Sequence, residues 1–138
     1  MNNQPKRKIL LAENNPDVRE LLLILLEMHH YTVLEATDTA EAVRIALENL
    51  PDLIFLDLAM PATDGTNAIA EIRRQPELSK TPILVNSADG NRGIDFFLNI
   101  EKFGSGYIEY LAKPINYRTL TLLINSILDK QYNFQAAA

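Results

Sequence analysis

Side chains that could do chemistry follow four short apolar runs in this chain. They are the carboxylate of Asp57, the acid and amide of Glu13 and Asn14, the hydroxyl of Ser87 and the amine of Lys113. An ionised carboxylate placed directly after a buried segment costs free energy unless a neighbouring group uses its charge. Asp57 follows a run of apolar residues, so it is the first candidate for such a use.

These side chains suit the transfer of a phosphoryl group to Asp57. A carboxylate can attack phosphorus and form an aspartyl phosphate, and the reaction then needs a divalent cation and fixed donors more than further covalent groups. Oxygen atoms of Glu13 and Asn14 are ligands of the kind that Mg²⁺ binds. Lys113 supplies a positive charge, and the Ser87 hydroxyl can donate to a phosphoryl oxygen. We therefore expect a phosphoacceptor site with Mg²⁺ as its cofactor.

The elements that must position these residues alternate along the chain. Mostly continuous apolar runs predict strands at Lys8–Ala12, Thr32–Ala36, Leu53–Asp57, Ile83–Ser87 and Tyr107–Ala112. Amphipathic stretches predict one helix that begins at Asn15-Pro16 and others at roughly Thr39–Asn49, Thr66–Arg74, Arg92–Lys102 and Asn116–Lys130. Asn15 and either Thr37 or Asp38 are the expected N-caps of the first two helices. Strict alternation predicts a doubly wound α/β fold, in which the carboxyl ends of the parallel strands share one edge.

Composition and charge limit the class of protein. The 138 residues suit one domain at 7–130, with an N-terminal extension (1–6) and a C-terminal tail (131–138) whose closing alanines are typical of an appended sequence. The net charge of −5 argues against a nucleic-acid surface, and the absence of cysteine excludes disulfides and thiol catalysis. No apolar run is long enough to span a membrane and no signal peptide is recognisable, so a cytoplasmic location is expected.

Four blocks of sequence resemble the receiver domain of bacterial two-component response regulators. The blocks are Ile9 to Asp17, Asp52 to Pro61 with Asp64-Gly65, Pro82 to Ala88, and Tyr110 to Ile115, in the family's order and close to its spacing. The resemblance implies a flavodoxin-like fold with strand order 2-1-3-4-5 and a helix after each strand. It also implies a signalling domain in a phosphorelay, which catalyses at most its own aspartyl phosphorylation and dephosphorylation.

The resemblance implies a magnesium site around the phosphoacceptor Asp57. Glu13, Asn14, Asp57 and the backbone carbonyl of Ala59 are the implied ligands. Where this chain has Asn14, the family usually carries an acid, and an amide oxygen lacks the formal charge that attracts a divalent cation. We therefore expect weak magnesium binding and slow phosphorylation in the absence of a partner.

The resemblance also implies a switch. Ser87 and Lys113 are the expected contacts of the phosphoryl group, and the small side chain of Ala88 leaves that group accessible. Tyr110 is the expected aromatic whose rotamer couples to the Ser87 hydroxyl. The peptide bond between Lys113 and Pro114 is expected to be cis, as in the family.

The implied partners are proteins. A sensor histidine kinase or a histidine phosphotransfer protein is the expected phosphodonor, and a downstream protein partner is expected on the face formed by the fourth helix, fifth strand and fifth helix. No nucleic acid and no membrane are expected to bind this domain, and a homodimer is left open. The 26 positions from Ser87 to Lys113 exceed the family's usual span. The longer segment fits either specific partner recognition or a tolerated loop insertion.

Two further features have open interpretations. Leu23 and Ile24 fall where an amphipathic first helix is normally polar, so they form either an outward patch or part of a more deeply buried helix. Asn86 stands where the family tends to be apolar, and it can hydrogen-bond within the site without an assigned role.

Three other functions are alternatives to a phosphoacceptor receiver. A pseudo-receiver, which is a protein-interaction module with weak or no magnesium-dependent phosphorylation, is the main alternative because of Asn14. A phosphatase of the haloacid dehalogenase type would carry a second aspartate at position 59, which is Ala59 here. A flavodoxin would carry a phosphate-binding loop of Ser, Thr and Gly in place of residues 13–16.

Overall fold

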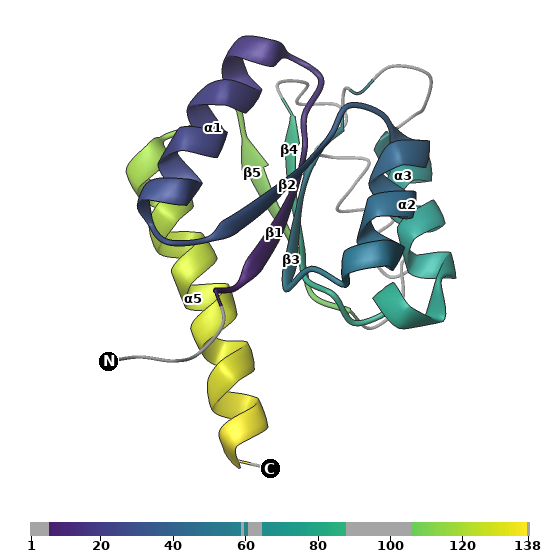
Figure 1. Cartoon of the computed structure of the whole chain (residues 1–138), viewed down its shortest axis with the longest axis vertical. Coiled ribbons are helices and arrows are strands. Elements are labelled where there is room, and N and C mark those ends of the chain that lie inside the picture. Colours follow the sequence, from purple (N-terminus) through teal and green to yellow (C-terminus); the bar gives the residue numbers. More distant parts are fainter. Residues whose placement is uncertain (1–5, 59, 61–64, 88–105, 138) are drawn as a thin grey trace.

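The computed structural model describes residues 6–58, 60, 65–87 and 106–137 (Figure 1). Its strands are β1 (Lys8–Ala12), β2 (Thr32–Ala36), β3 (Leu53–Asp57), β4 (Ile83–Ser87) and β5 (Ile108–Ala112). Its helices are α1 (Pro16–Met28), α2 (Thr39–Asn49), α3 (Gly65–Arg74), the short 3-10 helix η1 (Pro76–Leu78) and α5 (Tyr117–Ala137).

The strands form one parallel sheet in the order β2-β1-β3-β4-β5. This is the doubly wound α/β fold predicted from the sequence, with the flavodoxin-like order 2-1-3-4-5. Strands β1 to β4 have their predicted bounds, and β5 begins at Ile108, one residue later than predicted. The helix predicted at Arg92–Lys102 lies outside the described residues.

The first two helices begin where side chains can cap them. The Asn15 side-chain oxygen accepts hydrogen bonds from the backbone N–H groups of Asp17 and Val18, at 3.0 and 3.2 Å. Asp38 accepts one from the N–H of Glu41 at 2.8 Å. Such bonds satisfy donors that the first turn of a helix leaves without partners. Asn15 is thus the predicted cap of α1, and Asp38 is the cap of α2.

Each face of the sheet has its own apolar core. Figure 1 shows α1 and α5 on one side of the sheet and α2 and α3 on the other. Alternate side chains of a strand point to opposite faces, so each strand contributes to both cores. The core under α1 and α5 includes Ile9, Leu11, Leu22, Leu26, Leu53, Phe55, Leu84, Leu120 and Ile124. The core under α2 and α3 includes Leu10, Ala12, Ala42, Ala46, Ile54, Leu56, Ile69, Ile72, Ile83 and Val85.

Helix α5 is longer than the sequence pattern predicts. It begins at Tyr117 and continues to Ala137, so residues 131–137 of the predicted C-terminal tail are helical. That stretch contains neither glycine nor proline, and its glutamines and alanines favour a helix even without an apolar pattern. No helix in the described part of the chain combines the length and the hydropathy that crossing a membrane requires.

Candidate functional site

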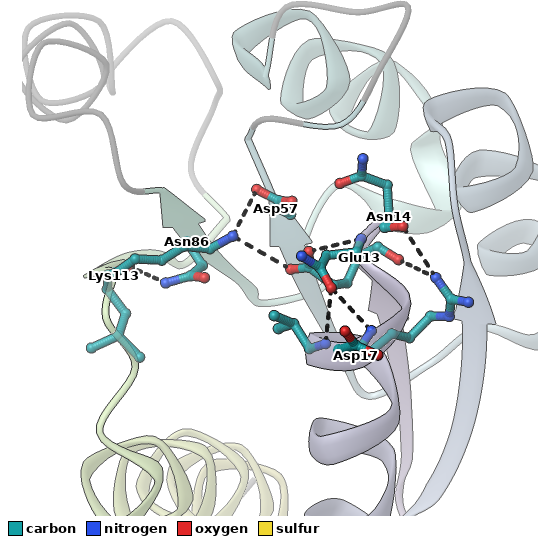
Figure 2. Close-up of polar contacts among 10 residues, drawn as sticks. Glu13, Asn14, Asp17, Asp57, Asn86 and Lys113 are labelled. Atoms are coloured by element: carbon teal, nitrogen blue, oxygen red, sulfur yellow. Dashed lines mark hydrogen bonds and ion pairs between the residues drawn. The ribbon is translucent and has the colours of Figure 1, made fainter.

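The structure brings Glu13, Asp57 and Lys113 together at the carboxyl edge of the sheet (Figure 2). Glu13 and Asp57 each stand two residues after a core residue under α1 and α5, namely Leu11 and Phe55, and therefore share that face. The Lys113 Nζ lies 3.7 Å from Asp57 Oδ1 and 3.8 Å from Glu13 Oε2. One ammonium group thus pairs with two carboxylates from different parts of the chain.

The three ionisable side chains at this edge are largely removed from solvent. The exposed fraction is 0% for Glu13 and 2% for Asp57, and the Lys113 side chain is 24% exposed. Burial raises the pKa of Glu13 to about 7, and hydrogen bonding to Asp57 and the negative charge of Asp57 act in the same direction. The charge of Lys113 and the N–H of Asn15 oppose this rise. Because two carboxylates share one lysine, a further cation would be favourable here.

Backbone contacts hold the loop that carries Glu13 and Asn14. The N–H of Asn15 donates to Glu13 Oε1 at 3.2 Å. Arg19 Nη1 donates to the carbonyl oxygens of Glu13 and Asn14, at 3.0 and 3.5 Å. Arg19 also pairs with Glu35 at 3.4 Å. Arg19 was not predicted from the sequence, although a cation near the amino end of a helix opposes the helix dipole and signals another partner.

The residues expected to complete a magnesium site are only partly described. Asn14 is exposed, and Figure 2 shows its amide extending on the Asp57 side of the loop. Asp17, by contrast, points away from Asp57 in that view. Ala59 and Ala88 lie outside the described residues.

Ser87 and Tyr110 meet through the backbone of β4. Ser87 is buried, and its carbonyl oxygen accepts hydrogen bonds from the Lys113 N–H at 2.9 Å and from the Tyr110 hydroxyl at 3.4 Å. These contacts connect the end of β4 to β5 and to Lys113, which follows it. The Lys113–Pro114 peptide bond is cis, as expected.

The oxygen atoms at this edge fit a hard divalent cation. Glu13 Oε2 is buried and accepts no hydrogen bond, so it is available to a metal. Carboxylate oxygens of Glu13 and Asp57 with the amide oxygen of Asn14 form an all-oxygen set of the kind that Mg²⁺ prefers. Within the described ranges, no group of three or more His, Cys, Asp or Glu side chains is placed to hold a metal. A cation here would therefore rely on two carboxylates and neutral oxygens.

An apolar row lies on the outer face of α1. Leu21, Ile24 and Met28 are 53%, 50% and 70% exposed and follow helical spacing. Leu23, however, is partly buried against the core under α1 and α5. Of the two interpretations of Leu23 and Ile24, the outward patch is right for Ile24 and deeper burial is right for Leu23. Leu21 and Met28 were missed, although their spacing from Ile24 was the available signal.

Comparison with known proteins decides the family. The sequence model for the response regulator receiver domain matches residues 9–125. The chain belongs to this family. Receiver domains are signalling modules of two-component systems, and the match covers every described residue of the candidate site.

Two curated proteins illustrate the similarity over most of this chain. The transcriptional regulatory protein ResD of Bacillus subtilis (strain 168) is 34% identical over 93% of this chain and 50% of its own length. Histidine kinase P4 of Formosa agariphila is 30% identical over 95% of this chain and 9% of its own length. The chain thus spans about half the length, or less, of these curated relatives.

A solved receiver domain has the same fold. It comes from the sensor histidine kinase PA1611 of Pseudomonas aeruginosa PAO1 and has a magnesium ion coordinated in its active site cleft. Its TM-score is 0.77 at 30% identity, and the comparison covers 91% of this chain and 99% of that one.

Proposed function

We propose that this receiver accepts a phosphoryl group on Asp57 from a histidine of a partner protein. A carboxylate oxygen of Asp57 attacks phosphorus, the P–N bond to the histidine breaks as the new P–O bond forms, and the imidazole takes up a proton. The observation that carries the proposal is the Lys113 ammonium, 3.7 Å from Asp57 and 3.8 Å from Glu13. Negative phosphoryl oxygens would arrive where a fixed cation already stands.

Glu13, Asn14, Asp57 and the carbonyl of Ala59 would hold Mg²⁺. When bound, Mg²⁺ neutralises phosphoryl oxygens and offsets their repulsion by the two buried carboxylates. Glu13 Oε2, which is buried and accepts no hydrogen bond, supports this assignment. Because Asn14 contributes an amide oxygen in place of a carboxylate, we expect weak binding.

Ser87 and Tyr110 would carry the signal away from the site. The Ser87 hydroxyl would donate to a phosphoryl oxygen beside the small Ala88, and Tyr110 would change its rotamer in response. Phosphorylation needs only to bias two existing conformations through new contacts of a charged group. We infer that the resulting output surface lies on the helix predicted at Arg92–Lys102, β5 and α5, where a downstream protein partner would bind.

The phosphodonor would be a sensor histidine kinase or a histidine phosphotransfer protein in the cytoplasm. The net charge of −5 gives no attraction to nucleic acid or to anionic membranes, so both the donor and the downstream partner are expected to be proteins. A homodimer is also compatible with this function.

Mass spectrometry after incubation with acetyl phosphate and Mg²⁺ tests the proposal. We expect a single added phosphoryl group in the wild-type protein and none in Asp57→Ala. Asp52→Ala is the matched control, because Asp52 lies at the opposite end of β3 and accepts a hydrogen bond from the Lys8 N–H at 2.7 Å. Added phosphoryl mass that persists in Asp57→Ala, or never appears in the wild type, would contradict the proposal.

The second candidate function is a pseudo-receiver that binds partners without efficient phosphorylation, and Asn14 is the feature that favours it. We predict that Asn14→Asp raises the affinity for Mg²⁺ by about tenfold or more, because it adds a charge beside the cation. A Mg²⁺ titration followed by calorimetry measures this change. Asn15→Asp, at the exposed cap of α1, adds the same charge next to the site and is expected to have a much smaller effect. Equal affinities of wild type and Asn14→Asp would refute the prediction.

A further inference from the structure

We propose that Asn86 is a positioning residue for Lys113. Its side-chain oxygen would accept a hydrogen bond from the lysine ammonium while Asp57 is being phosphorylated. The inference rests on the proposed function and adds a residue that neither the charge pattern nor the phosphoacceptor chemistry required.

Asn86 lies directly beside the phosphoacceptor. In the sheet it pairs in register with Asp57 on one side and with Leu111 on the other. It also stands two residues after Leu84, a core residue under α1 and α5, so its side chain shares the face of Asp57. Side chains of neighbouring strands in one register are roughly 5 Å apart. A fully buried amide therefore adjoins the reactive carboxylate.

The orientation of the Asn86 amide is determined by β5. Its Nδ2 donates to the carbonyl oxygen of Leu111 at 2.6 Å. A reversed amide would place two oxygen atoms against each other, so the side-chain oxygen must face away from that carbonyl. This Oδ1 is buried and has no hydrogen-bond partner. Leaving a buried acceptor without a partner costs free energy that a leucine, as at position 84, would not cost.

Lys113 has to pass Asn86 to reach the carboxylates. Its backbone N–H is bonded to Ser87 at the end of β4, and its amine lies next to Asp57 at the end of β3. Because β4 lies between β5 and β3, the lysine side chain crosses the position of Asn86. Figure 2 shows the side chain of Lys113 running alongside the Asn86 amide.

The lysine ammonium forms ion pairs with its two carboxylate partners at distances longer than those of hydrogen bonds. Its distances of 3.7 and 3.8 Å to the two carboxylates are those of ion pairs, longer than normal hydrogen bonds. An ammonium group carries three N–H donors, whereas Asn86 Oδ1 is an acceptor without a donor. A shift of the amine toward Asn86 would let it donate to the amide oxygen and remain paired with Asp57 when a phosphoryl group changes the charges around it. A lysine held in this way stays oriented toward the phosphoryl group during the transfer.

Two substitutions at Asn86 and one control test the inference. Asn86→Leu removes the acceptor but keeps a branched side chain, and Asn86→Thr keeps an acceptor in a smaller side chain in case the leucine prevents folding. Val85→Ala is the control, because Val85 directly precedes Asn86 in β4 and points to the opposite core. Each protein is measured for its rate of phosphorylation by acetyl phosphate and for the ¹⁵N NMR resonance of the Lys113 amine, assigned with Lys113→Arg.

We expect Asn86→Leu to be phosphorylated about tenfold more slowly, the effect of one hydrogen bond to a charged group, and to shift the Lys113 amine resonance. Asn86→Thr should fall between Asn86→Leu and wild type. Val85→Ala should lower the melting temperature and change neither readout. A loss of stability alone would not move the amine resonance.

The outcomes separate this inference from the proposed function. A wild-type protein that never gains a phosphoryl group would overturn the proposed function, and the inference with it. If the wild type is phosphorylated, while both Asn86 variants match its rate and leave the Lys113 resonance in place, the inference alone is wrong.

Discussion

Glu13 connects the charge of the site to the stability of the protein. Its pKa rises from an ordinary value of 4.5 to about 7 in the folded state, chiefly because it is buried. The folded protein therefore holds this proton more tightly than the unfolded chain does. The stabilisation from this group is complete below pH 4.5 and is lost as the pH rises through about 7.

Glu13→Gln is predicted to remove this part of the pH dependence. Between pH 4.5 and about 7, the wild type should lose on the order of 3 kcal/mol of unfolding free energy through Glu13, and the variant should not. Urea unfolding at several pH values, in the presence of a chelator, measures the difference. Glu48→Gln changes an exposed glutamate of α2 and is the control. Identical pH profiles of wild type and Glu13→Gln would show that Glu13 does not hold its proton more tightly in the folded state.

Arg73 connects several elements at the amino ends of the strands, on the side of the molecule opposite the site. Its guanidinium donates to the carbonyl oxygens of Leu78 and Thr81, at 2.8 and 2.6 Å, and to that of Tyr107 at 3.1 Å. Burial lowers the pKa of Arg73 to about 10. These hydrogen bonds connect the end of α3 to η1 and to the residues just before β4 and β5. All three acceptors are backbone carbonyl oxygens, so no acidic side chain takes part in these contacts.

Gly106 leaves room for the Arg73 guanidinium because it has no side chain. A Cβ atom added at Gly106 would lie 2.5 Å from the carbonyl oxygen of Ser79 and 2.7 Å from Cζ of Arg73. Gly106→Ala is therefore predicted to destabilise the protein by about 1–3 kcal/mol, the usual cost of overpacking. Thermal unfolding followed by circular dichroism measures this loss. An alanine variant with the melting temperature of the wild type would show that the backbone can move to accommodate the added Cβ without a loss of stability.

At the scale of the whole molecule, one sheet joins two cores that share no helix among the described residues. Ile72 of α3 and Ile124 of α5 are both fully buried, one in each core. We predict that Ile72→Val and Ile124→Val each cost about 1 kcal/mol. The double variant should lose the sum of the two, since the sites lie on opposite faces and share no partner.

Chemical denaturation of the four proteins measures this additivity. A single transition with additive losses is expected, because the same strands supply both cores and the molecule should unfold as one unit. Two separate transitions would show that the two cores unfold independently. A loss in the double variant far from the sum would show that the two sites interact.

Local signals account for most of what could be predicted. Strand bounds followed from continuous apolar runs, because strands covered on both faces need them. The cap at Asn15 followed from its position before Pro16, since capping depends only on residues nearby in the sequence. The length of α5 was missed because residues 131–137 extend a helix without continuing its apolar pattern.

By itself, the sequence determined the alternation of strands and helices and the presence of polar side chains at the strand ends. Only the tertiary structure decided that Lys113 pairs with both Glu13 and Asp57, that Arg19 holds the loop beside them and that Asn86 stands next to Asp57. Periodicity along a chain specifies which face a side chain takes within its own element. Which side chains meet depends on the register between strands that are far apart in the sequence, and continuous apolar runs, unlike alternating ones, do not specify that register.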